Sequence, residues 1–440
     1  MVHYQLLASL LWLYTAAIVL STDGFARMDD LNSALALISG LILVLDLATG
    51  LLQSREYLPS EPIVAVGFGI AIGPQGVDAF ELSTWGDPIV IVEQAARLTV
   101  ALAVTSIALR LPENYFRKRW RSMATLLGPG MVVMWLVSAA VVYLVFPVSV
   151  VVALLLGAIV TPTDPVLANS VVIGQTAEEN IPTRLRYLLS AEAGANDGGA
   201  YPFVFLGILL FEQSTDSALR EWFTHTIPVE VVGAILLGVL IGGVVGRLER
   251  WVSGEQFLEE TSVFTITVAL TLGTVGLITL LGGNEILGVF AAGLAYNWQA
   301  DPEDEAKEQR VEEVFNRLFT LPAFVLFGMI VPWGEWMALG WQGIAVVVGI
   351  LLFRRLPMMI TLASAIRPLD RPAATLFMGW FGPIGIAAVL YATIALRETG
   401  LEAVWPVVTL VVAGSILIHG MSGTLLTLRY GRLGDDTEWW

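Results

Sequence analysis

The pentapeptide TPTDP (residues 161–165) lies inside an apolar run and decides how this part of the chain folds. Pro165 has no N–H group, so the carbonyl of Thr161 loses its helical donor, and Pro162 frees another carbonyl one turn earlier. Carbonyls freed in an apolar environment must find protein, water or an ion. The pentapeptide therefore predicts an interrupted helix, with Asp164 held at the interruption.

The composition places that helix in a membrane. Of the 440 residues, 56% are hydrophobic and 14% are charged, and the mean hydropathy is +0.74, whereas a soluble domain carries about 25% charged residues. Apolar runs of about 20 residues recur along the chain, which predicts an all-α polytopic membrane protein. We expect membrane segments at 4–21, 31–53, 61–73, 86–110, 124–147, 148–173, 185–212, 227–247, 262–282, 284–299, 314–335, 337–366, 373–397 and 402–429.

The residue counts also exclude several kinds of site. The chain has no cysteine and only three scattered histidines, which excludes disulfides and thiolate metal centres and argues against a histidine metal cluster. The net charge of −16 argues against nucleic acid as a partner.

The basic residues predict the orientation in the membrane. Seventeen of the 23 Lys and Arg residues fall in loops on the same side as residues 110–122, and three fall on the other side. Since cytoplasmic loops carry the excess of Lys and Arg, this bias predicts that both termini are cytoplasmic.

The segments contain a repeat. Segments 124–147, 148–173 and 185–212 form one triple, and its middle member is broken by TPTDP. A second triple enters from the opposite side and is broken by GPIG, that is, by Gly382, Pro383 and Gly385; its segments are 337–366, 373–397 and 402–429. Two triples of opposite orientation with discontinuous central helices indicate an inverted-repeat secondary transporter.

The predicted organisation has five parts. They are an extra N-terminal transmembrane helix in 1–30, a first repeat in 31–212 with core helices in 124–212, a linker helix in 213–261, a second repeat in 262–429 with core helices in 337–429, and a short cytoplasmic tail in 430–440.

Buried ionisable residues gather in LLSAEAGANDGGAYPFVFL (188–206). On a helix, Asp197 lies about 140° from Glu192, so the two carboxylates face different neighbours. A bare carboxylate inside a bilayer needs a partner or a water path. We expect Arg354 or Arg355 to pair with Glu192, which leaves Asp197 as the candidate to bind a proton or a cation.

A further acid, Glu93, stands four residues before Arg97 in the segment 86–110. The spacing fits an internal ion pair. The alternative is that Glu93 lines an ion pathway.

Several of these motifs, taken together, resemble the sodium/proton antiporters of the NhaP and eukaryotic NHE branch, and especially the fungal plasma-membrane alkali-cation/proton antiporters. The motifs are TPTDPVLANSVV (161–172), LRYLLSAEAGANDGGAYPFVFL (185–206), GNEILGVFAAGLAYNW (283–298), FRRLP (353–357) and GWFGPIGIAAVLYA (379–392).

The resemblance implies roles for individual residues. Asp197 would bind the ion and carry the proton, and Asn196 would orient the site. Asp164 and the Thr163 region would belong to a crossing of unwound helices. The pairing of Glu192 with an arginine would favour Arg355 over Arg354, and Glu93 would contribute to the ion site, as would Thr161 at the break.

The resemblance also implies an architecture: thirteen or fourteen transmembrane helices, with two discontinuous helices crossing in a six-helix core, and a homodimer in the plasma membrane. Two positions depart from the family pattern. Ala193 replaces a frequent Ser, and Ile384 replaces a frequent Arg. The Asn196–Asp197 pair resembles the electroneutral, one-for-one exchangers.

The expected function is exchange of Na+ or Li+ for H+ by alternating access, serving cytoplasmic pH and sodium homeostasis. No cofactor and no enzyme activity are expected. The alternatives are an antiporter that prefers K+ and a cation channel; an intramembrane aspartyl protease would need a GxGD signature, which the sequence lacks.

Overall fold

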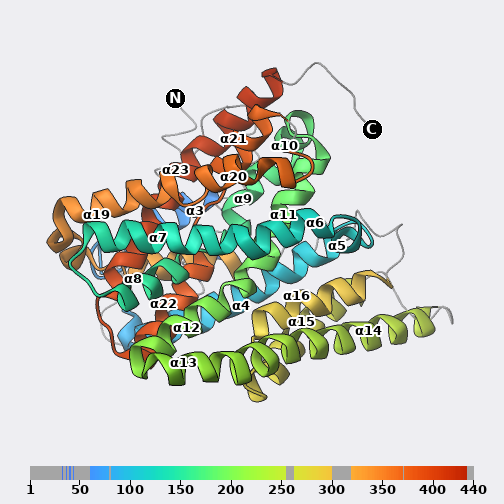
Figure 1. Cartoon of the computed structure of the whole chain (residues 1–440), viewed down its shortest axis with the longest axis horizontal. Helices are drawn as coiled ribbons and strands as arrows, with labels where there is room; N and C mark the ends of the chain where they lie inside the picture. The colour runs from blue at the N-terminus through green and yellow to red at the C-terminus, as the bar shows by residue number, and fades with distance from the viewer. Residues whose placement is uncertain are drawn as a thin grey trace.

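The computed structural model describes residues 60–78, 81–253, 262–299, 319–369 and 371–433, with single positions at 32, 36, 39, 40 and 43. Every regular element in those ranges is a helix, and the helices pack side by side in one bundle (Figure 1). The predictions for segment 4–21, for most of 31–53, and for the ends of the chain lie outside the described residues.

The helices used below follow one another along the chain. They are α3 (Glu61–Ile72), α4 (Pro88–Arg110), α5 (Tyr115–Lys118), α6 (Trp120–Thr125), η2 (Leu126–Gly130), α7 (Met131–Val145), α8 (Val150–Ile159), α9 (Pro165–Val172), α10 (Gln175–Asn180), α11 (Thr183–Gly199), α12 (Tyr201–Glu212), α13 (Thr215–Glu221), η3 (Trp222–Gly233), α14 (Ala234–Ser253), α15 (Ser262–Leu280), α16 (Glu285–Asn297), α18 (Leu321–Met329), α19 (Trp333–Phe353), α20 (Leu356–Leu362), η6 (Ala363–Ala365), α21 (Pro372–Trp380), α22 (Ile386–Thr399) and α23 (Val404–Leu433).

Five spans of the described chain are long and apolar enough to cross a bilayer: Pro88–Arg110, Trp120–Val145, Thr215–Trp251, Trp333–Ala365 and Val404–Leu433. Shorter apolar helices include α3, which precedes the first span, and α8, which lies between the second and the third. A crossing needs about 20 apolar residues, so the chain passes through the membrane several times.

The two predicted helix breaks are present, and they touch each other. One separates α8 from α9 at residues 160–164, and the other separates α21 from α22 at residues 381–385. The N–H of Asp164 in the first break donates to the carbonyl of Pro383 in the second, at 2.8 Å. The prediction of two discontinuous helices that cross is therefore confirmed.

Two predicted segments are divided where the sequence analysis expected continuity. The segment 337–366 splits into α19 and α20 at Arg354 and Arg355. Pro357 lies two residues after Arg355, and it leaves the carbonyl four residues earlier, that of Phe353, without its helical donor. The segment 185–212 likewise splits into α11 and α12, at Ala200.

A long helical span packs outside the crossing, and it is longer than the predicted segment 227–247 because α13, η3 and α14 are continuous from Thr215 to Trp251. Its α14 lies against α16 at the lower edge of Figure 1. A Cβ atom on Gly238 would lie 2.0 Å from the carbonyl oxygen of Gly288, so the glycine permits this close contact. The boundaries of the five predicted parts stay predictions.

Candidate functional site: two crossed helix breaks and a free carboxylate

Helix α11 carries three polar side chains into the centre of the bundle. Glu192, Asn196 and Asp197 are 1%, 0% and 1% exposed, and α11 packs against α4, α9 and α16. Since an isolated charge inside a bilayer is costly, each carboxylate needs a cation, a proton or water. The two carboxylates of α11 meet this need in different ways.

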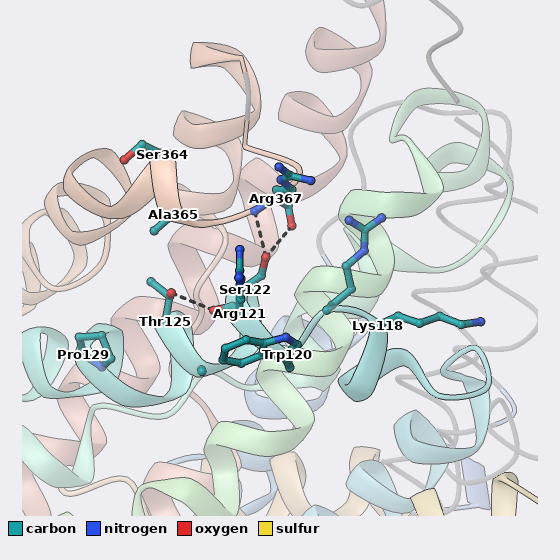
Figure 2. A pocket seen from close by; sticks show the side chains of 11 residues that line it. Lys118, Trp120, Arg121, Ser122, Thr125, Pro129, Ser364, Ala365 and Arg367 are labelled. Atoms are coloured by element: carbon teal, nitrogen blue, oxygen red, sulfur yellow. Dashed lines mark hydrogen bonds between the residues drawn. The ribbon is translucent and has the colours of Figure 1, made fainter.

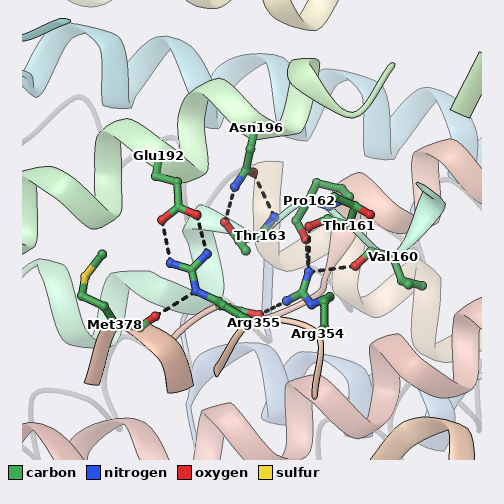
Figure 3. A network of polar contacts seen from close by, with 10 residues as sticks. Val160, Thr161, Pro162, Thr163, Glu192, Asn196, Arg354, Arg355 and Met378 are labelled. Atoms are coloured by element: carbon green, nitrogen blue, oxygen red, sulfur yellow. Dashed lines mark hydrogen bonds and ion pairs between the residues drawn. The ribbon is translucent and has the colours of Figure 1, made fainter. Parts of the chain in front are cut away.

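Glu192 is neutralised by Arg355 in a bidentate ion pair (Figure 3). Nη2 of Arg355 lies 2.6 Å from Oε2 of Glu192, and Nη1 donates to Oε1. The remaining Nε–H donates to the carbonyl of Met378 at 2.8 Å. The pair ties α11 to the break between α19 and α20, so it links the two triples.

Arg354, the alternative partner of Glu192, occupies a different place. Its guanidinium lies at the crossing (Figure 3), where Nη2 donates to the carbonyl of Gly382 in the second break. Nη1 donates to three carbonyls of the first break, those of Val160, Thr161 and Pro162, at 2.8, 2.7 and 3.0 Å. The carbonyl freed by Pro165 is thus satisfied by a cation, which also complements the negative ends of α8 and α21.

Asp164 has the complementary role at the other ends of the broken helices. Its Oδ1 accepts from the N–H groups of Val166 and Leu167 at 2.7 and 3.1 Å, at the start of α9. Its Oδ2 accepts from the N–H of Ile386 at 2.6 Å, at the start of α22. One carboxylate therefore caps two helices whose N-termini are positive.

This shared cap leads to a testable prediction at Gly385. A Cβ atom on Gly385 would lie 1.9 Å from Oδ2 of Asp164, so Gly385→Ala must displace the carboxylate from the amide of Ile386. We expect unfolding to become easier by about 1.5–3 kcal/mol, the usual contribution of a hydrogen bond to a charged group. Thermal denaturation of the purified protein measures the loss.

Gly276→Ala is the matched control, because the same change on α15 meets no atom within 4 Å. We expect that variant to melt at or above the wild-type temperature, since alanine favours a helix interior over glycine. Equal melting of both variants would contradict the shared cap.

Asn196 joins α11 to the first break. Its Oδ1 accepts from the N–H of Thr163 at 2.9 Å, and its Nδ2 donates to Oγ1 of the same residue at 2.8 Å. Thr161 uses its hydroxyl locally, donating to the carbonyl of Gly157 at 2.7 Å. The orientation of α11 against the break is therefore fixed one residue before Asp197.

Asp197 is the exception among these charges. Within the described part of the chain, no hydrogen-bond donor reaches Oδ1 or Oδ2, although both atoms are buried. Its backbone carbonyl accepts from Oη of Tyr391 at 2.5 Å, a contact that sequence reasoning missed. The preceding turn offers Ala193, which has no polar side-chain atom. The backbone of Asp197 is thus fixed by a hydrogen bond, while its carboxylate oxygens accept none from the described residues.

Glu93 pairs with a more distant arginine than the one that the sequence spacing suggested. Its carboxylate accepts from Nη1 of Arg397 on α22, so its ion pair joins two helices rather than one turn of α4. Nε of Arg97 is buried without a hydrogen-bond partner in the described chain. An internal pair between Glu93 and Arg97 is therefore wrong, because α22 brings a cation closer.

Comparison with known proteins identifies the fold and the family. The family model described as "Sodium/hydrogen exchanger, transmembrane" matches residues 36–429. The chain belongs to the sodium/hydrogen exchanger family. It is 32% identical to Na+/H+ antiporter 2 of Zygosaccharomyces rouxii, over 84% of its own length and 50% of that protein. It is 30% identical to a Na+/H+ antiporter of Saccharomyces cerevisiae, over 84% of its own length and 40% of that protein.

A solved structure has the same fold. The sodium proton antiporter MjNhaP1 from Methanocaldococcus jannaschii superposes with a TM-score of 0.69 at 17% identity, over 92% of this chain and 100% of that chain. The chain spans about half of the length of these two fungal relatives and of a third, a probable Na+/H+ antiporter of Schizosaccharomyces pombe. The inverted-repeat antiporter fold expected from the sequence is confirmed.

Proposed function

We propose that this exchanger moves Na+ (or Li+) and H+ in opposite directions across a membrane. The observation that carries the proposal is the carboxylate of Asp197, which is buried and has no donor among the described residues. A carboxylate in such a place favours neutralisation by a proton or by a cation. A bound proton removes the negative charge that attracts the cation, so the two ions compete for the same group. That competition couples the two ions. The names of the fungal relatives, Na+/H+ antiporters, support the same assignment.

The proposed cycle uses alternating access. With the site open to one side, Asp197 releases a proton and takes Na+; the neutralised core then moves, and a proton replaces Na+ on the other side. One cation for one proton makes the exchange electroneutral. Asn196 holds the site in orientation through Thr163.

The other proposed ligands lie around the crossing. Asp164, Thr161 and Thr163 would shape the ion site from the first break, and Glu93 would line its approach. Asp164 and Glu93 already have partners in this conformation, so their carboxylates would join the site only when those contacts change during the cycle.

We also propose the setting in which the exchange takes place. The protein would be a homodimer in the plasma membrane, with both termini in the cytoplasm, where it would serve pH and sodium homeostasis. The family is one of transporters, and no enzyme activity or bound cofactor is part of the proposal.

Proton movement in proteoliposomes tests the function. The wild-type protein is reconstituted with a pH gradient and zero membrane potential, and Na+, Li+ or K+ is added outside. Dissipation of the gradient by Na+ or Li+ is the expected result. Dissipation by K+ alone would favour the K+/H+ exchange named for a relative from Alkalimonas amylolytica that is 24% identical. Cation flux without proton movement would favour a channel.

Ala193 gives a prediction about ion affinity. Ala193 lies one helical turn before Asp197 and is buried, so Ala193→Ser places a hydroxyl on the same face of α11. We expect the half-saturating Na+ concentration to fall about two- to tenfold, because one added oxygen ligand should contribute about as much binding free energy as one hydrogen bond. Initial rates of proton movement at varied Na+ measure it.

Ala195→Ser is the control, since residue 195 lies on the opposite face of the helix from 193. A fall of equal size in both variants would show that the added hydroxyl acts on the helix as a whole and not on the ion.

A further inference from the structure

A second polar site lies away from the crossing, on the face that carries the basic loops. A cavity of about 640 Å³ opens between α6 with η2 on one side and η6 with the following loop on the other (Figure 2). Four cationic side chains line it: Lys118, Arg119, Arg121 and Arg367. The cavity therefore joins the first helix of one triple to the first helix of the other.

These four cations have no acidic partner in the described part of the chain. No ion pair within 4 Å involves any of them there, and the residues that line the cavity include no Asp or Glu. The chain holds 39 acidic residues against 23 basic ones, so partners are plentiful. Four like charges kept together in an acidic protein repel one another, and an anion relieves the repulsion.

The frame of the cavity is built by hydrogen bonds to the backbone of its arginines. Oγ of Ser122 accepts from the N–H of Arg367 at 2.9 Å and donates to its carbonyl at 3.1 Å. Oγ1 of Thr125 donates to the carbonyl of Arg121 at 2.9 Å. These bonds attach the backbone of Arg367 to α6 and use no guanidinium nitrogen of either arginine.

Apolar residues also line the cavity, and they lie where a membrane surface is expected. Trp120 is 60% exposed, and the guanidinium carbon of Arg121 lies 5.4 Å from its ring centroid. Pro129 and Ala365 complete this side. Exposed tryptophan is typical of the headgroup level of a bilayer. The cavity therefore combines cationic side chains with apolar ones that suit glycerol and acyl carbons.

We propose that this cavity binds the phosphate-bearing headgroup of an anionic phospholipid. Guanidinium groups bind phosphate oxygens in bidentate pairs, and basic pockets between transmembrane helices bind anionic headgroups. The bias of basic residues predicts that this face is cytoplasmic, where the anionic lipids lie. A free phosphate ion would use the same cations but would make no use of the apolar wall.

Binding of short-chain lipids to the purified full-length protein in detergent tests the proposal. The probes are dioctanoyl phosphatidylglycerol, dioctanoyl phosphatidylcholine and inorganic phosphate, each titrated to equilibrium. Arg121→Gln with Arg367→Gln removes two cavity charges and leaves the backbone bonds to Ser122 in place. Arg429→Gln with Arg432→Gln is the control, because both arginines are exposed on the same predicted side.

We expect the cavity variant to weaken phosphatidylglycerol binding about tenfold or more, and the control to weaken it less than about twofold. If the first variant does not purify, Lys118→Gln with Arg367→Gln carries the same expectation. Equal weakening in the control, or phosphatidylcholine binding as tightly as phosphatidylglycerol, would overturn the site. Displacement of the lipid by inorganic phosphate at equal concentration would assign the cavity to free phosphate instead.

Discussion

Asp197→Asn is expected to reduce Na+-driven proton movement in proteoliposomes to the level of protein-free vesicles. The amide that replaces the carboxylate has the same shape, but it can neither release a proton at neutral pH nor neutralise a cation. Because no donor among the described residues bonds to the wild-type carboxylate, its removal breaks no hydrogen bond. We therefore expect the variant to fold, and to melt at or above the wild-type temperature.

Two further measurements make this prediction specific. Asp216→Asn, the same chemical change at an exposed position of α13, should leave transport unchanged. Added Na+ should raise the melting temperature of the wild type and of Asp216→Asn, but not of Asp197→Asn, since a ligand stabilises only the state that binds it. Unchanged transport by Asp197→Asn would show that another group carries the ions.

Arg355→Leu is expected to cause the largest loss of stability of any single substitution considered. It leaves the carboxylate of Glu192, which is 1% exposed, without its cation and removes the donor to Met378. Removing one partner of a buried ion pair costs about 3–5 kcal/mol. Denaturant titration of the purified protein in detergent micelles measures the difference. If the variant is too unstable to purify, its amount in the membrane falls instead.

The double variant Glu192→Leu with Arg355→Leu separates charge from packing. Replacing both members of a buried pair by apolar residues is often neutral or stabilising, so we expect it to recover much of the lost stability. Arg220→Leu, at an exposed position on α13, should change stability by less than about 0.5 kcal/mol. A small effect of Arg355→Leu would mean that Glu192 is neutral in the folded protein.

Much of the crossing follows from local chemistry in the sequence. Prolines at 162, 165 and 383 remove specific donors, so the two breaks are predictable without any tertiary information. The angular separation of Glu192 and Asp197 on one helix likewise predicts two different surroundings. The structure shows an ion pair for the first and, among the residues it describes, no donor for the second.

The long-range partners were harder to predict, because they depend on how the helices pack. Arg354 and Arg355 are adjacent, and one of them was expected on Glu192; only the break between α19 and α20 turns Arg354 toward the carbonyls of the crossing. Glu93 has a cation one turn away in sequence, but its partner is Arg397, 304 residues distant. The contact from Tyr391 had no sequence signal beyond a hydroxyl in an apolar run.

The pairing of charges around the crossing has a consequence for the empty carrier. Among the described residues at the crossing, Arg354 and Arg355 formally balance Asp164 and Glu192, and Asp197 is left as one negative charge. If the unloaded core moved, this charge would cross the hydrocarbon region and the transmembrane potential. The potential alone would add about 2.3 kcal/mol for each 100 mV that opposes the movement. A core loaded with a proton or Na+ carries none. In the proposed cycle, the empty carrier would therefore stay on the side where it last unloaded, and neither gradient would leak away through it.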